Sequence, residues 1–151
     1  MTETITCRVR RVLPTDENAM AALAEQLGYA CTGAEVRKRL DAMKDPTQYS
    51  VFAAVQPHGE VVGWIGAYVL RAVELAPLVE ISGLVVDGTL RSRGIGKALL
   101  KAAEGWASSI GLPVISVNSN ITRERAHRFY VSDGYELVKT QNVFRKSILS
   151  R

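Results

Sequence analysis

A chain of 151 residues has the length of one domain, and a domain of this size buries about 70% of the surface that its unfolded form exposes. The composition, 47% hydrophobic and 23% charged, excludes the low-hydrophobicity balance of disordered chains. Nineteen Lys and Arg against fifteen Asp and Glu leave a net charge of +4, but the cations form short groups without a long run or interleaved aromatics. We therefore expect a single domain over residues 1–151, with no nucleic-acid partner.

No apolar run reaches the roughly 20 residues that cross a bilayer, and the N-terminus lacks a basic stretch followed by an apolar block. We therefore expect a cytoplasmic protein with no membrane partner. Cys7 and Cys31 are isolated, with neither a C-x-x-C spacing nor a nearby histidine, so we expect no metal.

The first part of the chain predicts one strand and two helices. Residues 5–13 alternate apolar and polar side chains, as a half-buried strand does, and Pro14 ends this segment. Thr15 is a candidate cap for a first helix, which Gly28 stops. Thr32-Gly33-Ala34-Glu35 has the form of a capping box and predicts the start of a second helix.

A hairpin and a further strand follow. Residues 50–56 and 61–70 are rich in β-branched and aromatic side chains and flank a turn at 57–60. The stretch 78–86 is the next strand, and its apolar residues 83–86 indicate burial on both faces.

From Ile95, apolar residues recur at i, i+3, i+4, i+7, i+8 and i+11, which predicts an amphipathic helix that ends near Ile110. Four further elements are predicted after it: a strand at 114–117, a helix at 123–132 and strands at 135–139 and 143–148. The order β-α-α-β-β-β-α-β-α-β-β predicts an α/β (mixed α+β) fold in which helices cover a mixed sheet.

The segment Arg91-Ser92-Arg93-Gly94-Ile95-Gly96-Lys97-Ala98 leads from a strand into the amphipathic helix. The first turn of a helix presents N–H groups without intrahelical partners, at the positive end of the helix dipole. Glycine lets the backbone approach an anion, and arginine can grip phosphate oxygens with two N–H groups. The segment therefore predicts a phosphate-binding turn, with an ordinary solvated turn as the alternative.

Two familiar phosphate motifs do not match this turn. The P-loop pattern fails because position 91 is Arg and position 98 is Ala. The dinucleotide fingerprint fails because a pattern that starts at Gly94 has its last glycine position at Leu99.

The turn instead resembles the cofactor signature of the GNAT superfamily of acetyl-CoA-dependent N-acetyltransferases, Arg/Gln-x-x-Gly-x-Gly/Ala at the start of the family's third helix. Leu84-Val85-Val86 looks like the family's fourth strand, whose backbone pairs with the pantetheine arm. The segments 126–130, Ala-His-Arg-Phe-Tyr, and 134–136, Gly-Tyr-Glu, resemble the second family block. The resemblance thus covers essentially the whole chain.

This resemblance implies a three-layer α/β/α fold around a mixed, mostly antiparallel sheet of about seven strands, splayed between strands 4 and 5. It also implies acetyl-CoA as the cosubstrate. Leu84, Val85, Val86 and the turn from Arg91 to Ala98 are then the cofactor-binding residues.

Acetyl transfer to an amine needs a base for the amine proton and an acid for the departing thiolate. Glu80 precedes Leu84 by four residues, the position of the general base in some family members, and a period of two puts both side chains on one face with Ser82. The alternative for Glu80 is an exposed residue that solvates the start of its strand. Tyr130 is the candidate acid beside the cofactor, because a phenol of pKa about 10 is protonated at neutral pH, and core packing is its alternative. Asn120 is expected to bind the pantetheine, or else the backbone of its own turn.

The acceptor is less constrained by the sequence. The helix at 35–44 is expected to line the acceptor site, yet it carries Arg37, Lys38 and Arg39 and offers no acidic pocket for a cationic amine. We expect a small-molecule amine, with a protein N-terminus or lysine as the alternative. A CoA-binding regulatory domain without turnover is a second class of function. Phe144 and the last strand are expected to be buried either within the monomer or in a homodimer.

Overall fold

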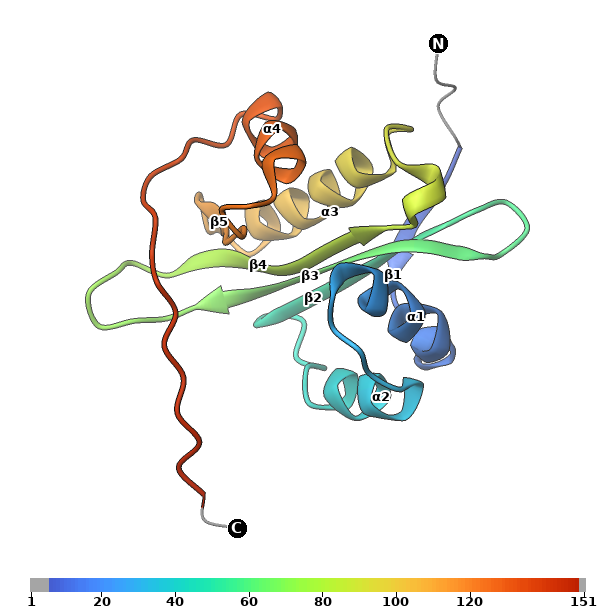
Figure 1. Cartoon of the computed structure of the whole chain (residues 1–151), viewed down its shortest axis with the longest axis horizontal. Helices are drawn as coiled ribbons and strands as arrows, with labels where there is room; N and C mark the ends of the chain where they lie inside the picture. The colour runs from blue at the N-terminus through green and yellow to red at the C-terminus, as the bar shows by residue number, and fades with distance from the viewer. Residues whose placement is uncertain (1–5, 150–151) are drawn as a thin grey trace. The chain divides into compact units, whose positions relative to one another are not determined.

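In this computed structural model, which describes residues 6–149, five strands form one sheet in the order β1-β2-β3-β4-β5 (Figure 1). The strands are β1 (Arg8–Arg11), β2 (Tyr49–Val55), β3 (Val61–Leu70), β4 (Leu78–Val86) and β5 (Ile115–Val117). Neighbours are antiparallel except β4 and β5, which are parallel. The chain divides into two compact units, Met1–Asn118 and Ser119–Arg151, and the five strands belong to the first.

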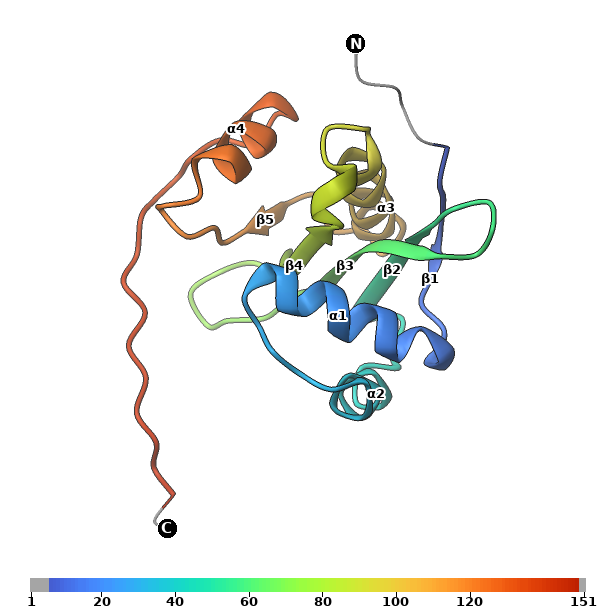
Figure 2. The same ribbon diagram turned by 45° about the vertical axis from the view of Figure 1, so that its right-hand side comes forward.

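Helices cover both faces of the sheet in the first unit. The helices α1 (Glu17–Leu27) and α2 (Gly33–Asp41) lie on one face, and α3 (Ile95–Ser109) lies on the other (Figure 1 and Figure 2). Three layers around a mixed, mostly antiparallel sheet confirm the expected fold class.

The start of α1 differs from the prediction. A 3₁₀ turn at Pro14–Asp16 precedes the helix, so the expectation that Thr15 caps it is wrong, and Asp16 is the N-cap. The Asp16 carboxylate accepts a hydrogen bond of 2.7 Å from the Leu13 N–H and bonds of 2.8 and 3.1 Å from the Arg10 guanidinium. This buried carboxylate therefore fixes how β1 turns into α1.

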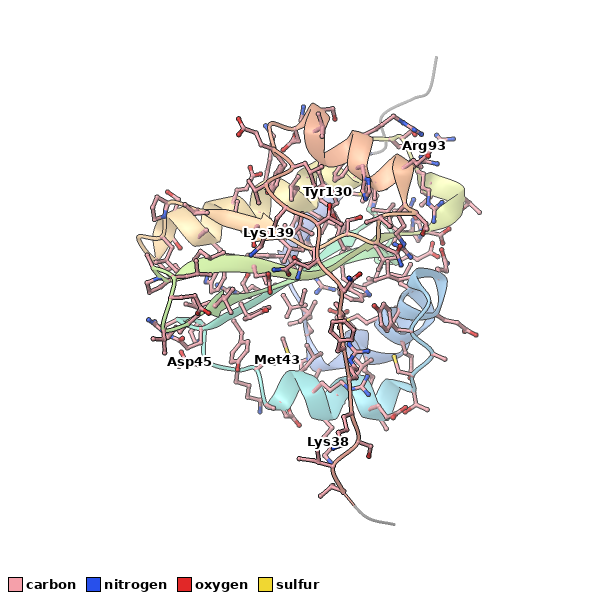
Figure 3. The ribbon with its side chains drawn as sticks, turned by 60° about the vertical axis from the view of Figure 1, so that its left-hand side comes forward. Lys38, Met43, Asp45, Arg93, Tyr130 and Lys139 are labelled. Atoms are coloured by element: carbon pink, nitrogen blue, oxygen red, sulfur yellow. The ribbon has the colours of Figure 1, made fainter. Side chains whose placement is uncertain are left out.

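The capping box of α2 is confirmed. The Thr32 N–H donates to Glu35 at 2.9 Å, and the Glu35 N–H donates to the Thr32 hydroxyl at 3.1 Å. The helix ends at Asp41, before the predicted end at residue 44. Met43 lies between α2 and the sheet, whereas Lys38 lies on the outer side of α2 (Figure 3).

Apolar burial holds α3 to the sheet. Leu99, Ala103 and Trp106 are buried against the sheet, as the helical spacing predicted, and Leu100, which that spacing did not include, is buried as well. Each buried leucine side chain contributes about 2 kcal/mol when it leaves water. The predicted end of the helix is also confirmed, with Ile110 as its C-cap.

Both tryptophans satisfy their indole N–H groups, one on each face of the sheet. Trp64 donates to the carbonyl of Met20 in α1 at 3.2 Å, and Trp106 of α3 donates to the carbonyl of Pro46 at 2.9 Å. These bonds join segments that are 44 and 60 residues apart in the sequence.

Three strand predictions need correction. β1 begins at Arg8, and Ile5 lies outside the described residues. Residues 135–139 and 143–148 form no strand, so the described sheet has five strands rather than about seven. Alternation predicts a strand only where a partner edge supplies hydrogen bonds, and these segments have no ladder partner in the described chain. The predicted two-sided burial of 83–86 is also wrong, since only Val85 is buried there.

The second unit contains the helix α4 (Glu124–Ser132), close to the predicted range. Over the described residues 6–149, no helix combines the length and the apolarity that a membrane span requires.

Candidate active site

A β-bulge at Ser82 decides which side chains of β4 share a face. On β3, Gly66 pairs with Gly83, while the next residue, Ala67, pairs with Ile81, so Ser82 is the extra residue. One extra residue reverses the alternation of side chains beyond it.

The expectation that Glu80 and Leu84 share a face is wrong for this reason. Glu80 pairs with Tyr68 and Leu84 with Ile65, and these two β3 residues point to opposite faces because they are three positions apart. Trp64 lies on the face of Tyr68 and donates its indole N–H to α1. Glu80 therefore lies on the face that α1 and α2 cover.

Glu80 is half-buried and interacts with both neighbouring strands. The Tyr68 hydroxyl donates to its Oε2, and the Ser116 hydroxyl lies 3.5 Å from its Oε1, at the long limit of a hydrogen bond. Burial, the hydrogen bond to Glu80 and the charge of Glu80 together raise the pKa of Tyr68 to about 12. The phenol is thus a donor across the neutral pH range, and Glu80 belongs to a polar cluster rather than to an exposed strand start.

The sequence patterns do not identify Tyr68 and Ser116 as site residues. Tyr68 is one of several aromatic residues in a strand pattern, and Ser116 lies in a short predicted strand that carries no recognisable motif. A hairpin register between β3 and β4 would have placed Tyr68 near Glu80, 12 residues later, but that register depends on the bulge at Ser82.

Strands β4 and β5 pair over a short distance and then stop. Val79, Glu80 and Ile81 pair with β5, whereas the stretch 83–86 has ladder partners on β3 alone among the described residues. One edge of Leu84-Val85-Val86 therefore has no β5 partner in the described sheet, and an extended ligand could pair with such an edge.

The turn before α3 has two residues in the left-handed region. Ser92 has a φ of 64° and Gly94 a φ of 84°, and Gly94 is the N-cap of α3. For the serine this conformation costs about 1–2 kcal/mol, which the surrounding structure must offset. The Gly88 N–H donates a 2.9 Å hydrogen bond to the side-chain oxygen of Gln26 in α1, which ties this loop to the helix layer on the other face of the sheet.

The side chains of the predicted turn differ in how far they are exposed to solvent. Arg91 and Lys97 are exposed, and Arg93, labelled in Figure 3, is half-buried. Ile95 is buried in the core, so its side chain is not available to a ligand at the helix start. Cations and free helix N–H groups at one helix start suit a phosphate group.

Tyr130 belongs to the second unit, on α4. Its ring contacts Phe129 and Tyr135, with centroid distances of 5.2 and 5.7 Å. Burial raises the pKa of Tyr130 above its ordinary value, and the charge of Arg123 lowers it by a smaller amount. The phenol therefore stays protonated at neutral pH, as an acid must.

Asn120 makes local contacts within the second unit. Its side-chain oxygen accepts hydrogen bonds from the Thr122 N–H and hydroxyl at 3.0 and 2.9 Å, and its carbonyl lies 2.9 Å from Nε2 of His127. The side-chain oxygen thus has the turn role that the sequence left open as the alternative.

A groove of about 230 Å³ opens between α2 and the first residues of β2. Its lining includes Arg37, Met43, Lys44 and Tyr49. Glu80 does not line it, and Lys44 forms an ion pair with Asp41. Tyr49, which pairs with Tyr68 on the neighbouring strand, does line it, so the groove begins one strand away from the Tyr68–Glu80 pair.

Residues 14–135 match the model of the acetyltransferase (GNAT) family. The chain belongs to this family. It is accordingly an N-acetyltransferase, and acetyl-CoA is the acyl donor of the family. The family that the sequence motifs suggested is thereby confirmed.

Named relatives agree with this assignment. The uncharacterized N-acetyltransferase YhdJ of Bacillus subtilis is 32% identical over 111 residues, which are 74% of this chain and 77% of that protein. An aminoalkylphosphonate N-acetyltransferase of Salmonella typhimurium is 39% identical over 80 residues, which are 52% of each chain.

Solved structures share the fold. The structure of AAC(6')-Iy in complex with the bisubstrate analogue CoA-S-monomethyl-acetylneamine has a TM-score of 0.81 to this chain at 18% identity. The match covers 94% of this chain and 99% of that one.

Proposed function

We propose that this enzyme transfers an acetyl group from acetyl-CoA to a primary amine of a small molecule, with Glu80 as the base and Tyr130 as the acid. The observation that carries the proposal is the hydrogen-bonded, half-buried Glu80 carboxylate, which lies on the parallel ladder next to the unpaired edge of β4. A carboxylate at this place can take a proton from an amine that reacts beside the strand.

Acetyl-CoA fits the residues of the first unit. The free edge of Leu84-Val85-Val86 offers backbone groups to the amides of the pantetheine arm. The helix start after Gly94, together with Arg91, Arg93 and Lys97, offers N–H groups and positive charge to the pyrophosphate. Bound there, the cosubstrate supplies an acetyl thioester to the site.

The proton balance of the reaction assigns the two side chains their roles. An alkylamine has a pKa of about 10.4, so Glu80, directly or through a water, must take a proton before or during attack. The new N–C bond forms as the C–S bond breaks, and Tyr130 gives its phenolic proton to the departing sulfur. The raised pKa of Tyr130 supports this role because the phenol holds its proton until it is needed.

A small-molecule acceptor is favoured by the relatives. Proteins similar to this chain are named as acetyltransferases of aminoalkylphosphonate and of aminoglycosides. The charges of α2 do not oppose a cationic amine as strongly as the sequence suggested. Arg37 and Arg39 lie 3.8 Å from the carboxylates of Glu17 and Glu35, which offset part of their charge.

Release of free thiol from acetyl-CoA tests the proposal. The assay combines the purified chain, acetyl-CoA and a panel of aminoalkylphosphonates, aminoglycosides and amino acids. We expect turnover with one class of amine and a loss of about 100-fold in kcat for Glu80→Gln. Binding of acetyl-CoA without thiol release for any amine would contradict the enzyme reading and favour a CoA-binding regulatory domain.

A further inference from the structure

Three polar side chains form a row across the sheet at the point where β4 and β5 are paired. Tyr68 on β3 pairs with Glu80 on β4, which pairs with Ser116 on β5. Because directly paired residues share a face, the three side chains point the same way. The row continues on β2 with Tyr49, which pairs with Tyr68.

The two oxygens of the Glu80 carboxylate have different partners. Tyr68 donates to Oε2, and Ser116 lies 3.5 Å from Oε1. The terminal torsion of a glutamate is broad, so an unrestrained carboxylate samples many orientations. A hydrogen bond on Oε2 and a contact at the long limit on Oε1 orient the carboxylate plane and leave Oε1 as the less engaged oxygen.

We propose that Tyr68 is a positioning residue, which holds Oε2 of Glu80 so that Oε1 meets the acceptor amine. This inference rests on the proposed function, in which Glu80 takes the amine proton. Tyr68 itself touches no substrate in this account and acts through Glu80.

The backbone around this pair is well suited to a fixed geometry. Glu80 has strands on both sides, and its neighbours Val79 and Ile81 are buried. Sites built on paired strands hold side chains more closely than sites on loops. The high pKa of Tyr68 keeps its hydroxyl protonated over the whole working range, so the donor is never lost to ionisation.

Glu80 is the one charged residue in the row on the described strands. On β2 the residue in the row is Tyr49, and on β5 it is Ser116, which does not titrate. In the helices on this face, Glu17 of α1 is paired with Arg37 of α2. Within residues 6–118, no cation forms an ion pair with Glu80, which leaves Tyr68 as its principal partner.

The pH dependence of kcat/KM separates positioning from mere packing. Tyr68→Phe keeps the ring and removes the hydroxyl, and Tyr49→Phe is the matched control one strand away in the same row. A hydrogen bond donated to a carboxylate favours its charged form, so we expect its loss to move the acidic limb of the profile to higher pH. We expect kcat to fall about 10-fold at neutral pH for Tyr68→Phe, with an unchanged KM for acetyl-CoA. The profile of Tyr49→Phe should superimpose on that of the parent.

A second readout does not need activity. With ¹³C-labelled tyrosine, the ring signal of Tyr68 is followed by NMR up to high pH in the parent and in Glu80→Gln. Removal of the negative acceptor should start the titration of Tyr68 about one pH unit lower than in the parent.

The outcomes of the two experiments are distinct. A Tyr68→Phe enzyme that is folded and has the parental profile overturns the positioning role, and so does a Tyr68 titration that does not respond to Glu80→Gln. The titration of Tyr68 could shift in Glu80→Gln although the parent protein acetylates no amine. That result would contradict the proposed function, but the interaction between Tyr68 and Glu80 would still stand.

Discussion

Ile81 on β4 and Val117 on β5 form the last pair of the parallel ladder. The bulge residue Ser82 follows at once, and beyond it β4 pairs with β3 alone among the described residues. The end of the ladder therefore separates two functions of one strand. Glu80 lies on the paired part, and the backbone proposed to bind pantetheine lies on the part with a free edge.

Gly94→Ala tests the turn before α3. An alanine at a φ of 84° costs about 1–2 kcal/mol, and relief of that strain would move the first N–H groups of the helix. We expect the Kd for acetyl-CoA to rise about 10-fold, measured by calorimetry.

Gly105→Ala is the matched control in the same helix. Its added Cβ meets no atom within 4 Å, so we expect a gain of roughly 0.5–1 kcal/mol in stability and an unchanged Kd. Equal affinities in the two variants would show that the conformation at Gly94 does not matter for binding.

Tyr130→Phe tests the acid. Loss of the phenolic proton should lower kcat about 100-fold and leave the KM for acetyl-CoA unchanged. Since burial raises the pKa of Tyr130, the alkaline decline in rate that depends on it should begin above the ordinary phenol value of about 10. A variant that keeps its rate would assign Tyr130 to packing.

Asp16→Asn tests the junction between β1 and α1. Burial disfavours the charged form of Asp16, but hydrogen bonds from Arg10 and the Leu13 N–H outweigh it, and the pKa of Asp16 is lowered. A lowered pKa means that the contribution to stability is complete above the unfolded value of about 3.9 and is lost as pH falls through the folded value. We expect the variant to lose about 2 kcal/mol at pH 7 in urea unfolding. The difference in the free energy of unfolding between the parent and Asp16→Asn should narrow below about pH 4. A difference that does not change with pH would show that the charge of Asp16 does not stabilise this junction.

Gly63→Ala tests the packing beneath the proposed cofactor strand. The added Cβ would lie 2.9 Å from the carbonyl oxygen of Val85 and 3.1 Å from Cδ1 of Leu99. Backbone cannot move aside as a side-chain end can, so we expect a loss of about 1–3 kcal/mol. Thermal unfolding measures this loss of stability. A stability equal to that of the parent would mean that β3 and β4 can move apart to accept the added Cβ.

Local patterns predicted much of this molecule because their causes are local. The Thr32–Glu35 capping box and the α3 periodicity from Ile95 depend on residues within a few positions of each other, and both were confirmed. The bulge at Ser82 depends on a register between two strands, which a period of two cannot reveal.

The site shows the same limit. Glu80 could be chosen from the family resemblance, by its position four residues before Leu84, but its partner Tyr68 is identified only after β3 and β4 are paired. The two final strands were predicted from local strand signals, which carry no information about a partner edge.

Amide hydrogen exchange with and without acetyl-CoA shows whether the cosubstrate binds along β4 and at the start of α3. We expect saturating acetyl-CoA to slow exchange of the amides in Leu84-Val85-Val86 and in the turn from Arg91 to Ala98. Measured binding of acetyl-CoA with unchanged exchange in both segments would contradict this binding site.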